Sequence, residues 1–238
     1  MTDLGKYTKE IKKLILSAEH ILLICHINPD GDAAGAMLSM RRWIISQGKE
    51  ADMISPNALE KFLMWMKDAD KIVDFHHNPE KGTELINRAD LIIMVDFNSP
   101  SRMGKAESLV TASGARKIVI DHHPEPDNFA DIILSDTDSS STSELVYFLV
   151  TSMEGKEFTD GDFIEAVYVG IITDTGNFQH GLYNGDTMRT VGHLLDQGVD
   201  KEKIVNRIFS NFSADRMLLK GYALNKRMVV MPEYHTAY

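Results

Sequence analysis

The sequence has little cysteine, no excess of positive charge and no long apolar run, and each shortage excludes a class of protein. A single cysteine, Cys25, excludes a disulfide within the chain and is typical of cytoplasmic proteins. The formal net charge of −10 leaves no basic excess for a long nucleic-acid groove. No apolar run approaches the length of a membrane span, and the opening MTDLGKYTKE lacks the apolar region of a signal peptide. We therefore expect a soluble, cytoplasmic protein with no membrane partner and no groove for long DNA.

What is present is an alternation of short apolar runs with helical patterns. The runs are ILLIC (21–25), ADMIS (51–55), LIIMV (91–95), KIVI (117–120) and DIILS (131–135). Three of them are almost wholly apolar, which is typical of parallel strands covered on both faces. Helical patterns occupy 33–47, 141–153, 186–196, 201–210 and 214–228. The pattern predicts an α/β fold with an open, mainly parallel sheet, helices on both faces, and a linker helix after it.

One helix carries a start signal of its own. The tetrapeptide STSE places Ser141 at the N-cap and Glu144 three residues later. This spacing predicts a capping box. In that motif the Ser141 hydroxyl accepts the backbone N–H of Glu144, and the Glu144 carboxylate accepts the backbone N–H of Ser141.

Polar side chains follow the apolar runs that are expected to be strands, with AVYVGIIT (166–173) counted among them, and ligands of open α/β sheets bind at such strand ends. They are His26, Asp30 and Asp32 after ILLIC, Asp96 after LIIMV, Asp121, His122 and His123 after KIVI, and Asp174 after the apolar stretch AVYVGIIT. A single aspartate in such a place is usually a helix cap or a turn former. A whole set converging on one sheet edge would be strongly repulsive unless cations were bound. The sequence therefore predicts a metal site at strand ends.

The types of side chain indicate which metal. Mixed imidazole and carboxylate ligands suit Mn²⁺, Zn²⁺ or Fe²⁺ better than Ca²⁺, and the absence of a thiolate ligand favours Mn²⁺. A set this large can hold two divalent ions, about 3.5–4 Å apart, with one carboxylate between them, an arrangement suited to hydrolysis at phosphorus. The ions would also supply the positive field that the acidic chain lacks.

Four segments in order carry a family resemblance. HINPDGDAAG, VDFN, DHH (121–123) and GIITDTGNF resemble motifs I to IV of the DHH phosphoesterase superfamily. STSELVYFLV and LKGYALNKRMVV are similar to the subgroup that contains the bacterial oligoribonuclease (nanoRNase)/pAp phosphatase. Family II inorganic pyrophosphatases share the layout, but their first motif typically reads NPDTD, so Gly31 favours the nanoRNase-like branch.

The resemblance implies a role for each residue of the set. One metal would be bound by His26, Asp30 and Asp96, and the other by Asp32, Asp96, His122 and Asp174, so that Asp96 bridges the two. His123 would contact the scissile phosphate and assist the leaving group, with Asp96 as the second catalytic residue. Asp121 would orient a histidine rather than bind metal. Arg102 is either a phosphate contact or a plain surface arginine.

The family also implies a second domain. Its members carry a C-terminal DHHA1 domain with a glycine-rich motif that holds the substrate, and nothing similar precedes Tyr238. The tail MVVMPEYHTAY resembles a strand that is cut off. We expect residues 1–212 to form the metal-binding catalytic domain, and residues 213–238 to form the linker helix and the start of a truncated DHHA1-like domain.

The expected activity follows from the subgroup. It is a Mn²⁺-dependent phosphodiesterase and phosphatase in which two metals activate water. The substrates would be short oligoribonucleotides, cleaved from one end, and/or 3′-phosphoadenosine 5′-phosphate (pAp). The alternatives are an inorganic pyrophosphatase or exopolyphosphatase, and a catalytically silent nucleotide-binding module. The sequence leaves open the native metal and the oligomeric state, a homodimer included.

Overall fold

The computed structural model describes residues 4–181, 183–210 and 212–238. The chain divides into two compact units, Met1–Lys201 and Glu202–Tyr238. The domain boundary expected after residue 212 stays a prediction.

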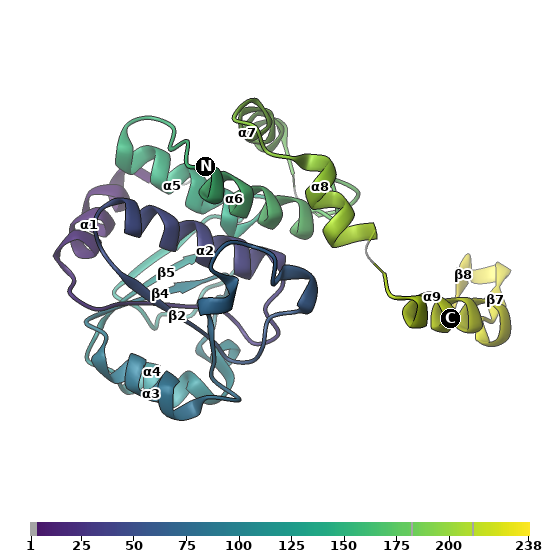
Figure 1. The fold of residues 1–238 in the computed structure, drawn as a ribbon, viewed down its shortest axis with the longest axis horizontal. Helices are drawn as coiled ribbons and strands as arrows, with labels where there is room; N and C mark the ends of the chain where they lie inside the picture. The colour runs from purple at the N-terminus through teal and green to yellow at the C-terminus, as the bar shows by residue number, and fades with distance from the viewer. Residues whose placement is uncertain (1–3, 182, 211) are drawn as a thin grey trace. The chain divides into compact units, whose positions relative to one another are not determined.

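A six-stranded sheet forms the centre of the first unit (Figure 1). Its strands are β1 (Ile21–Ile24), β2 (Ala51–Ser55), β3 (Val73–Asp74), β4 (Leu91–Val95), β5 (Arg116–Asp121) and β6 (Ile132–Ser135). They lie in the order β3-β2-β1-β4-β5-β6, and every neighbouring pair is parallel. This confirms the predicted fold class, and five of the six strands lie where the apolar runs predicted them. The two-residue β3 was not predicted.

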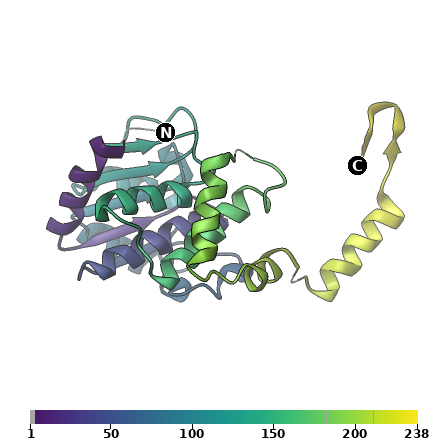
Figure 2. The same ribbon diagram turned by 90° about the horizontal axis from the view of Figure 1, so that it is seen from above.

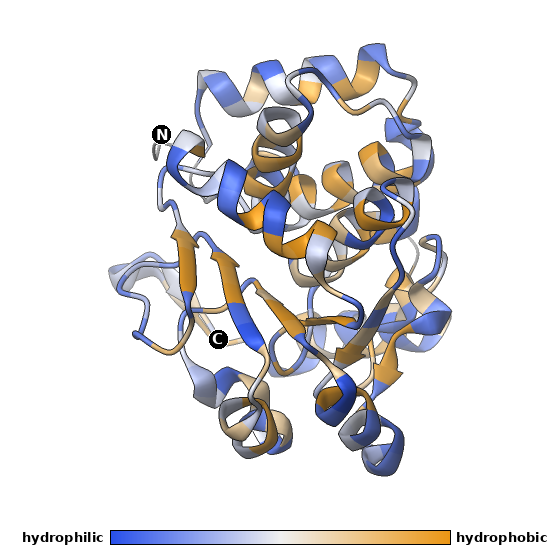
Figure 3. Ribbon diagram, turned by 90° about the vertical axis from the view of Figure 1, so that its left-hand side faces the viewer, coloured by the Kyte–Doolittle hydropathy of each residue, from blue (hydrophilic) through white to orange (hydrophobic). Residues whose placement is uncertain are grey.

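Helices cover both faces of the sheet (Figures 1 and 2). One layer contains α1 (Leu4–Ser17), α2 (Gly31–Ser46), α5 (Thr142–Glu154) and α6 (Gly161–Asp174), and the other contains α3 (Pro79–Arg88) and α4 (Glu107–Ala112). Strand residues alternate between the layers. Leu22, Ile24 and Ile92, for example, pack in one cluster with Leu85 and Val110 of α3 and α4. Because both faces are buried, β1 and β4 are apolar along their whole length, and Figure 3 shows mainly hydrophobic colouring in the sheet.

The stretch AVYVGIIT, read from the sequence as one of the strand-like runs, is part of helix α6. Its residues Val167 to Ile172 are all buried, because α6 packs against both α2 and α5. A helix enclosed on all sides has no polar face, so its apolar run cannot be told from a buried strand by periodicity. The reading of this segment as a strand is wrong, and Asp174 ends a helix.

The close packing of α2 on α6 depends on glycines of the motifs. A Cβ added at Gly35 would lie 2.6 Å from the carbonyl oxygen of Ala166, and one at Gly31 would lie 2.4 Å from the Thr173 side chain. These contacts are too short for a larger residue unless the helices separate. Gly31 therefore brings the start of α2, and the aspartates beside it, close to the end of α6.

The predicted capping box forms only in part. The Ser141 hydroxyl accepts the backbone N–H of Glu144 at 3.0 Å, as predicted. The Glu144 carboxylate, however, accepts the N–H of Ser140 at 2.8 Å instead of that of Ser141. Glu144 is only 1% exposed and also accepts the hydroxyl of Thr187 from α7 (Gly185–Asp196). The Glu144 carboxylate therefore does not complete the capping box, because it bonds to Ser140 and to Thr187 of α7 instead.

The second unit is helical and ends in a small hairpin. The helix α8 (Lys201–Val205) continues as a π-helix, Asn206–Ser210, and α9 (Ala214–Tyr222) continues as another, Ala223–Arg227. The strands β7 (Val230–Met231) and β8 (Thr236–Ala237) pair antiparallel. The helix predicted over 214–228 is therefore present. Among the described residues, no helix combines the length and apolarity needed to cross a membrane.

Candidate metal centre

The candidate site lies beyond the carboxyl ends of β1, β4 and β5. The chain runs outward from β1 to β2 and β3, and then returns to the other side of β1 with β4, so β1 and β4 flank the point where the strand order reverses. Ligands of open α/β folds bind at such a point. Asp96 directly follows β4, and His122 and His123 directly follow β5. Asp174 reaches the same place from the end of α6.

His26, Asp30 and Asp96 form one group, here called the His26 cluster. The His26 Nε2 atom lies 3.3 Å from Asp96 Oδ2 and 3.9 Å from Asp30 Oδ1. Nδ1 of the same ring lies 2.7 Å from the carbonyl oxygen of Ile27, to which it must donate, so Nε2 keeps a lone pair facing the carboxylates. The Asp30 side chain is 57% exposed, and its Oδ1 caps α2 by accepting two backbone N–H groups.

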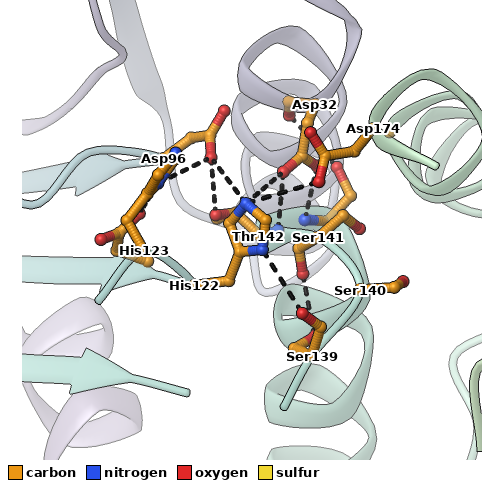
Figure 4. Close-up of polar contacts among 12 residues, drawn as sticks. Asp32, Asp96, His122, His123, Ser139, Ser140, Ser141, Thr142 and Asp174 are labelled. Atoms are coloured by element: carbon orange, nitrogen blue, oxygen red, sulfur yellow. Dashed lines mark hydrogen bonds and ion pairs between the residues drawn. The ribbon is translucent and has the colours of Figure 1, made fainter. Parts of the chain in front are cut away.

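Asp32, His122 and Asp174 form a second group, the His122 cluster (Figure 4). His122 Nε2 lies 3.9 Å from Asp32 Oδ2 and 3.6 Å from Asp174 Oδ2. Its Nδ1 is 3.3 Å from the carbonyl oxygen of Ser139, so here too Nε2 is the nitrogen free to bind a cation. Asp32 is only 1% exposed.

Asp96 faces both clusters. Its Oδ2 is the atom near His26, while its Oδ1 lies 3.7 Å from His122 Nε2. The residue is 2% exposed and has a φ of 67°, in the left-handed region that non-glycine residues seldom adopt. Its N–H donates to the carbonyl oxygen of Ile120 in β5, which holds this backbone turn against the sheet. Strain at such a residue is typical of functional sites.

His123 and Asp121 form a hydrogen-bonded pair next to the clusters. His123 Nδ1 lies 2.8 Å from Asp121 Oδ1, and this hydrogen bond is the main reason that the pKa of His123 is raised. Asp121 is fully buried, whereas the His123 side chain is 40% exposed. His123, Asp96 and His122 could also surround one cation, so the distances alone allow His123 either role, ligand or substrate contact.

The electrostatics of the site indicate cation binding. Burial, and then the charges of Asp32 and Asp30, raise the pKa of Asp96 well above its usual range. The pKa of Asp174 rises to about 6, first because of burial and next because of Asp32. Burial lowers the pKa of His26, which keeps its imidazole neutral near pH 7. Crowded carboxylates beside the neutral imidazole of His26 are a donor set that divalent cations stabilise, so these residues fit a metal site.

Arg102 lies in the 3₁₀ segment Pro100–Ala106, beside the loop that follows β1. Its carbonyl oxygen accepts the N–H of Ile27 at 2.7 Å, and its side chain is exposed. Its positive charge adds to the lowering of the pKa of His26 and partly opposes the rise in the pKa of His123. At this position the Arg102 side chain is compatible with a contact to a substrate phosphate, and that contact stays a prediction.

No pattern in the sequence indicates that the start of α5 belongs to the site. The STSE pattern predicts a helix cap, and its segment resembles the subgroup, but neither indicates a contact with the site. In the structure, the Thr142 hydroxyl donates to Asp96 and the Thr142 N–H donates to Asp32 (Figure 4). Sequence spacing cannot signal these contacts, because they join residues that are 46 and 110 positions apart.

Comparison with known proteins supplies the relatives of this chain. Residues 20–171 match the model of the DHH family, N-terminal domain. The chain is 27% identical over 203 residues to the bifunctional oligoribonuclease and PAP phosphatase NrnA of Bacillus subtilis, an alignment that covers 84% of this chain and 60% of that protein. This chain therefore spans less than two thirds of the length of that relative.

Two solved structures have the same fold. The crystal structure of an exopolyphosphatase-related protein from Bacteroides fragilis aligns with 100% of this chain and 70% of its own, with a TM-score of 0.93 and 34% identity. The exonuclease RecJ bound to manganese aligns with 88% of this chain and 55% of its own, with a TM-score of 0.56 and 13% identity. At this low identity, the second likeness shows the fold alone.

Proposed function

This chain belongs to the DHH family, and from that premise we propose that it is a divalent-metal-dependent phosphoesterase that hydrolyses short oligoribonucleotides, pAp, or both. The observation that carries the proposal is the position of Asp96, which belongs to the His26 cluster and also faces the His122 cluster. A carboxylate with one oxygen facing each cluster is the bridging ligand that a two-metal hydrolase needs.

The proposal assigns three side chains to one metal position and four to the other, with Asp96 in both. His26, Asp30 and Asp96 would hold one ion. Asp32, Asp96, His122 and Asp174 would hold the other. Two divalent ions bound there would activate water and neutralise phosphoryl oxygens. Mn²⁺ is the preferred ion because the donors are imidazoles and carboxylates without a thiolate.

The remaining residues have roles that their surroundings support. Asp121 holds the His123 ring through Nδ1 and favours its charged form, which leaves Nε2–H free to donate a proton to the leaving oxygen. Arg102 would balance charge on a phosphoryl oxygen. Burial of Asp96 and Asp32 keeps water away from the carboxylates and strengthens their interaction with cations.

The substrate class rests on the relatives. The Bacillus protein is named as an oligoribonuclease and PAP phosphatase. The Bacteroides protein, whose title describes it as exopolyphosphatase-related, favours a second candidate, a phosphohydrolase that acts on polyphosphate or pyrophosphate. A silent nucleotide-binding module is the third reading, and the complete set of candidate ligands argues against it.

One activity panel separates these readings. The purified protein with Mn²⁺ would be given a diribonucleotide, pAp, pyrophosphate and polyphosphate in parallel, with Asp96→Asn as the inactive control. Release of mononucleotides or AMP supports the proposal. Phosphate release from polyphosphate or pyrophosphate alone would replace it with the second candidate, and no turnover by metal-loaded protein would favour the silent module.

A further inference from the structure

The first turn of α5 contacts both clusters from one side (Figure 4). Thr142 is fully buried, and its hydroxyl donates to Asp96 Oδ1 at 2.9 Å. The N–H of the same residue donates to Asp32 Oδ2 at 2.7 Å, and the N–H of Ser143 donates to Asp32 Oδ1 at 2.8 Å. A single residue therefore links the shared carboxylate to a carboxylate of the His122 cluster.

We propose that Thr142 is a positioning residue whose hydroxyl orients the shared carboxylate of Asp96, and so fixes the separation of the two metal positions. The inference rests on the proposed function in one respect, namely that both clusters bind metal. It concerns a residue that lies outside the four motifs.

The hydroxyl of Thr142 can orient Asp96 because each oxygen of the Asp96 and Asp32 carboxylates has a limited number of lone pairs. Each carboxylate oxygen can accept about two hydrogen bonds or metal contacts. On Asp96, the Thr142 hydroxyl takes one lone pair of Oδ1, so one remains for the His122 cluster, while Oδ2 faces His26. On Asp32, the two N–H groups of α5 take one lone pair of each oxygen. The Thr142 hydroxyl thus fixes the rotation of the Asp96 carboxylate relative to Asp32.

The segment that carries Thr142 is itself held firmly. The buried Glu144 carboxylate accepts the N–H of Ser140 at 2.8 Å and the hydroxyl of Thr187 at 3.2 Å. The carbonyl oxygen of Ser139, in the same segment, accepts Nδ1–H of His122. Three residues of the two clusters, Asp32, Asp96 and His122, are therefore oriented by one rigid stretch of chain. Groups that orient metal ligands in this way typically contribute about 10–100-fold to metal affinity.

The test compares Thr142→Val, which keeps the shape of the side chain and removes the hydroxyl, with Thr142→Ser, which keeps the hydroxyl. The matched control is Thr8→Val, because Thr8 is also buried and its hydroxyl bonds to Leu4 and Ser152 in α1 and α5, outside the clusters. Calorimetric titration with Mn²⁺ measures the number and affinity of bound ions. Electron paramagnetic resonance measures the magnetic coupling between the two ions, which depends on the bridging carboxylate.

We expect Thr142→Val to weaken binding of the second Mn²⁺ by about 10–100-fold and to change the coupled signal. Thr142→Ser should restore both, and Thr8→Val should match the wild-type protein. Wild-type affinity and coupling in Thr142→Val would overturn the inference, as would equal losses in Thr142→Ser or Thr8→Val. A wild-type protein that binds two coupled ions but hydrolyses nothing in the panel would refute the proposed function alone, since these readouts do not depend on activity. Fewer than two ions in the wild-type protein would refute both.

Discussion

The two clusters of the site differ in how firmly the fold holds their carboxylates. In the His122 cluster, Asp32 is 1% exposed, and both of its oxygens accept backbone N–H groups from α5. In the His26 cluster, the side chain of Asp30 is 57% exposed, and its hydrogen bonds are those of an ordinary cap at the start of its own helix. The difference indicates one preorganised metal position and one that is open to solvent. We therefore expect the ion at the His26 cluster to exchange more readily.

The largest effect should come from the residue that the clusters share. Asp96→Asn removes the bridging charge from both positions, and we expect kcat/KM to fall by about three orders of magnitude or more, with loss of bound metal. Activity and metal content of the purified variant would be measured together. Retention of more than a few percent of activity with unchanged metal content would contradict the two-metal reading, and with it the division into two clusters.

The next largest effect separates the two adjacent histidines. His122→Ala should lose metal, whereas His123→Ala should keep both ions and lose about 10²–10⁴-fold in kcat, because it removes a proton-transfer partner. Metal analysis of both variants decides whether His123 belongs to the substrate or to the His122 cluster. Equal metal loss in the two variants would make His123 a ligand.

A matched pair of aspartate variants tests the contrast in preorganisation directly. Asp32→Asn places an amide NH₂ against a backbone N–H donor, so we expect Mn²⁺ affinity to fall by about 100-fold, compared with about 10-fold for Asp30→Asn. Asp30→Asn keeps an oxygen that can cap α2. Competition with a chelating dye measures both affinities. A larger loss of Mn²⁺ affinity in Asp30→Asn than in Asp32→Asn would contradict this difference between the two clusters.

The smallest effect concerns the pH dependence of the metal-free protein. The pKa of Asp174 is raised to about 6, so the folded state binds its proton more tightly than the unfolded state does. The stability that this carboxyl contributes is present below about pH 4 and is lost as the pH rises through about 6. Denaturant unfolding of metal-free wild-type protein and of Asp174→Asn should therefore diverge between pH 4 and pH 7, with the wild type losing stability relative to the variant. Parallel curves would show that the neighbours of Asp174 do not raise its pKa. Saturating Mn²⁺ should reverse the divergence, because metal binding stabilises the deprotonated carboxylate that only the wild-type protein has.

The two units differ in how far their helices and strands are buried. In the first unit, strands such as β4 are buried along their whole length. In α9, by comparison, Leu218 and Leu219 are 72% and 68% exposed, and the helix buries no residue. Its helical pattern was nevertheless predicted, because amphipathic spacing is a local property of the sequence.

Much of the fold could be predicted because its signals are local. The runs ILLIC and LIIMV are apolar without alternation, and that pattern indicates a strand buried on both faces. The polar residues after them were predicted to meet, and the structure brings them together, although their roles as ligands stay predictions. The strand reading of AVYVGIIT was wrong because burial on all sides removes the periodicity on which such a reading depends.

The sequence by itself determined which chemical groups end the strands, because hydrophobic runs and the residues that follow them are fixed in the primary structure. Only the tertiary structure decided that Asp96 turns one oxygen to each cluster, that the Glu144 carboxylate holds Ser140, and that Thr142 links two carboxylates. The physical reason is that a hydrogen bond depends on distance and direction between its atoms. For residues far apart in the chain, those are set by the order of the strands and the packing of α5 beside them.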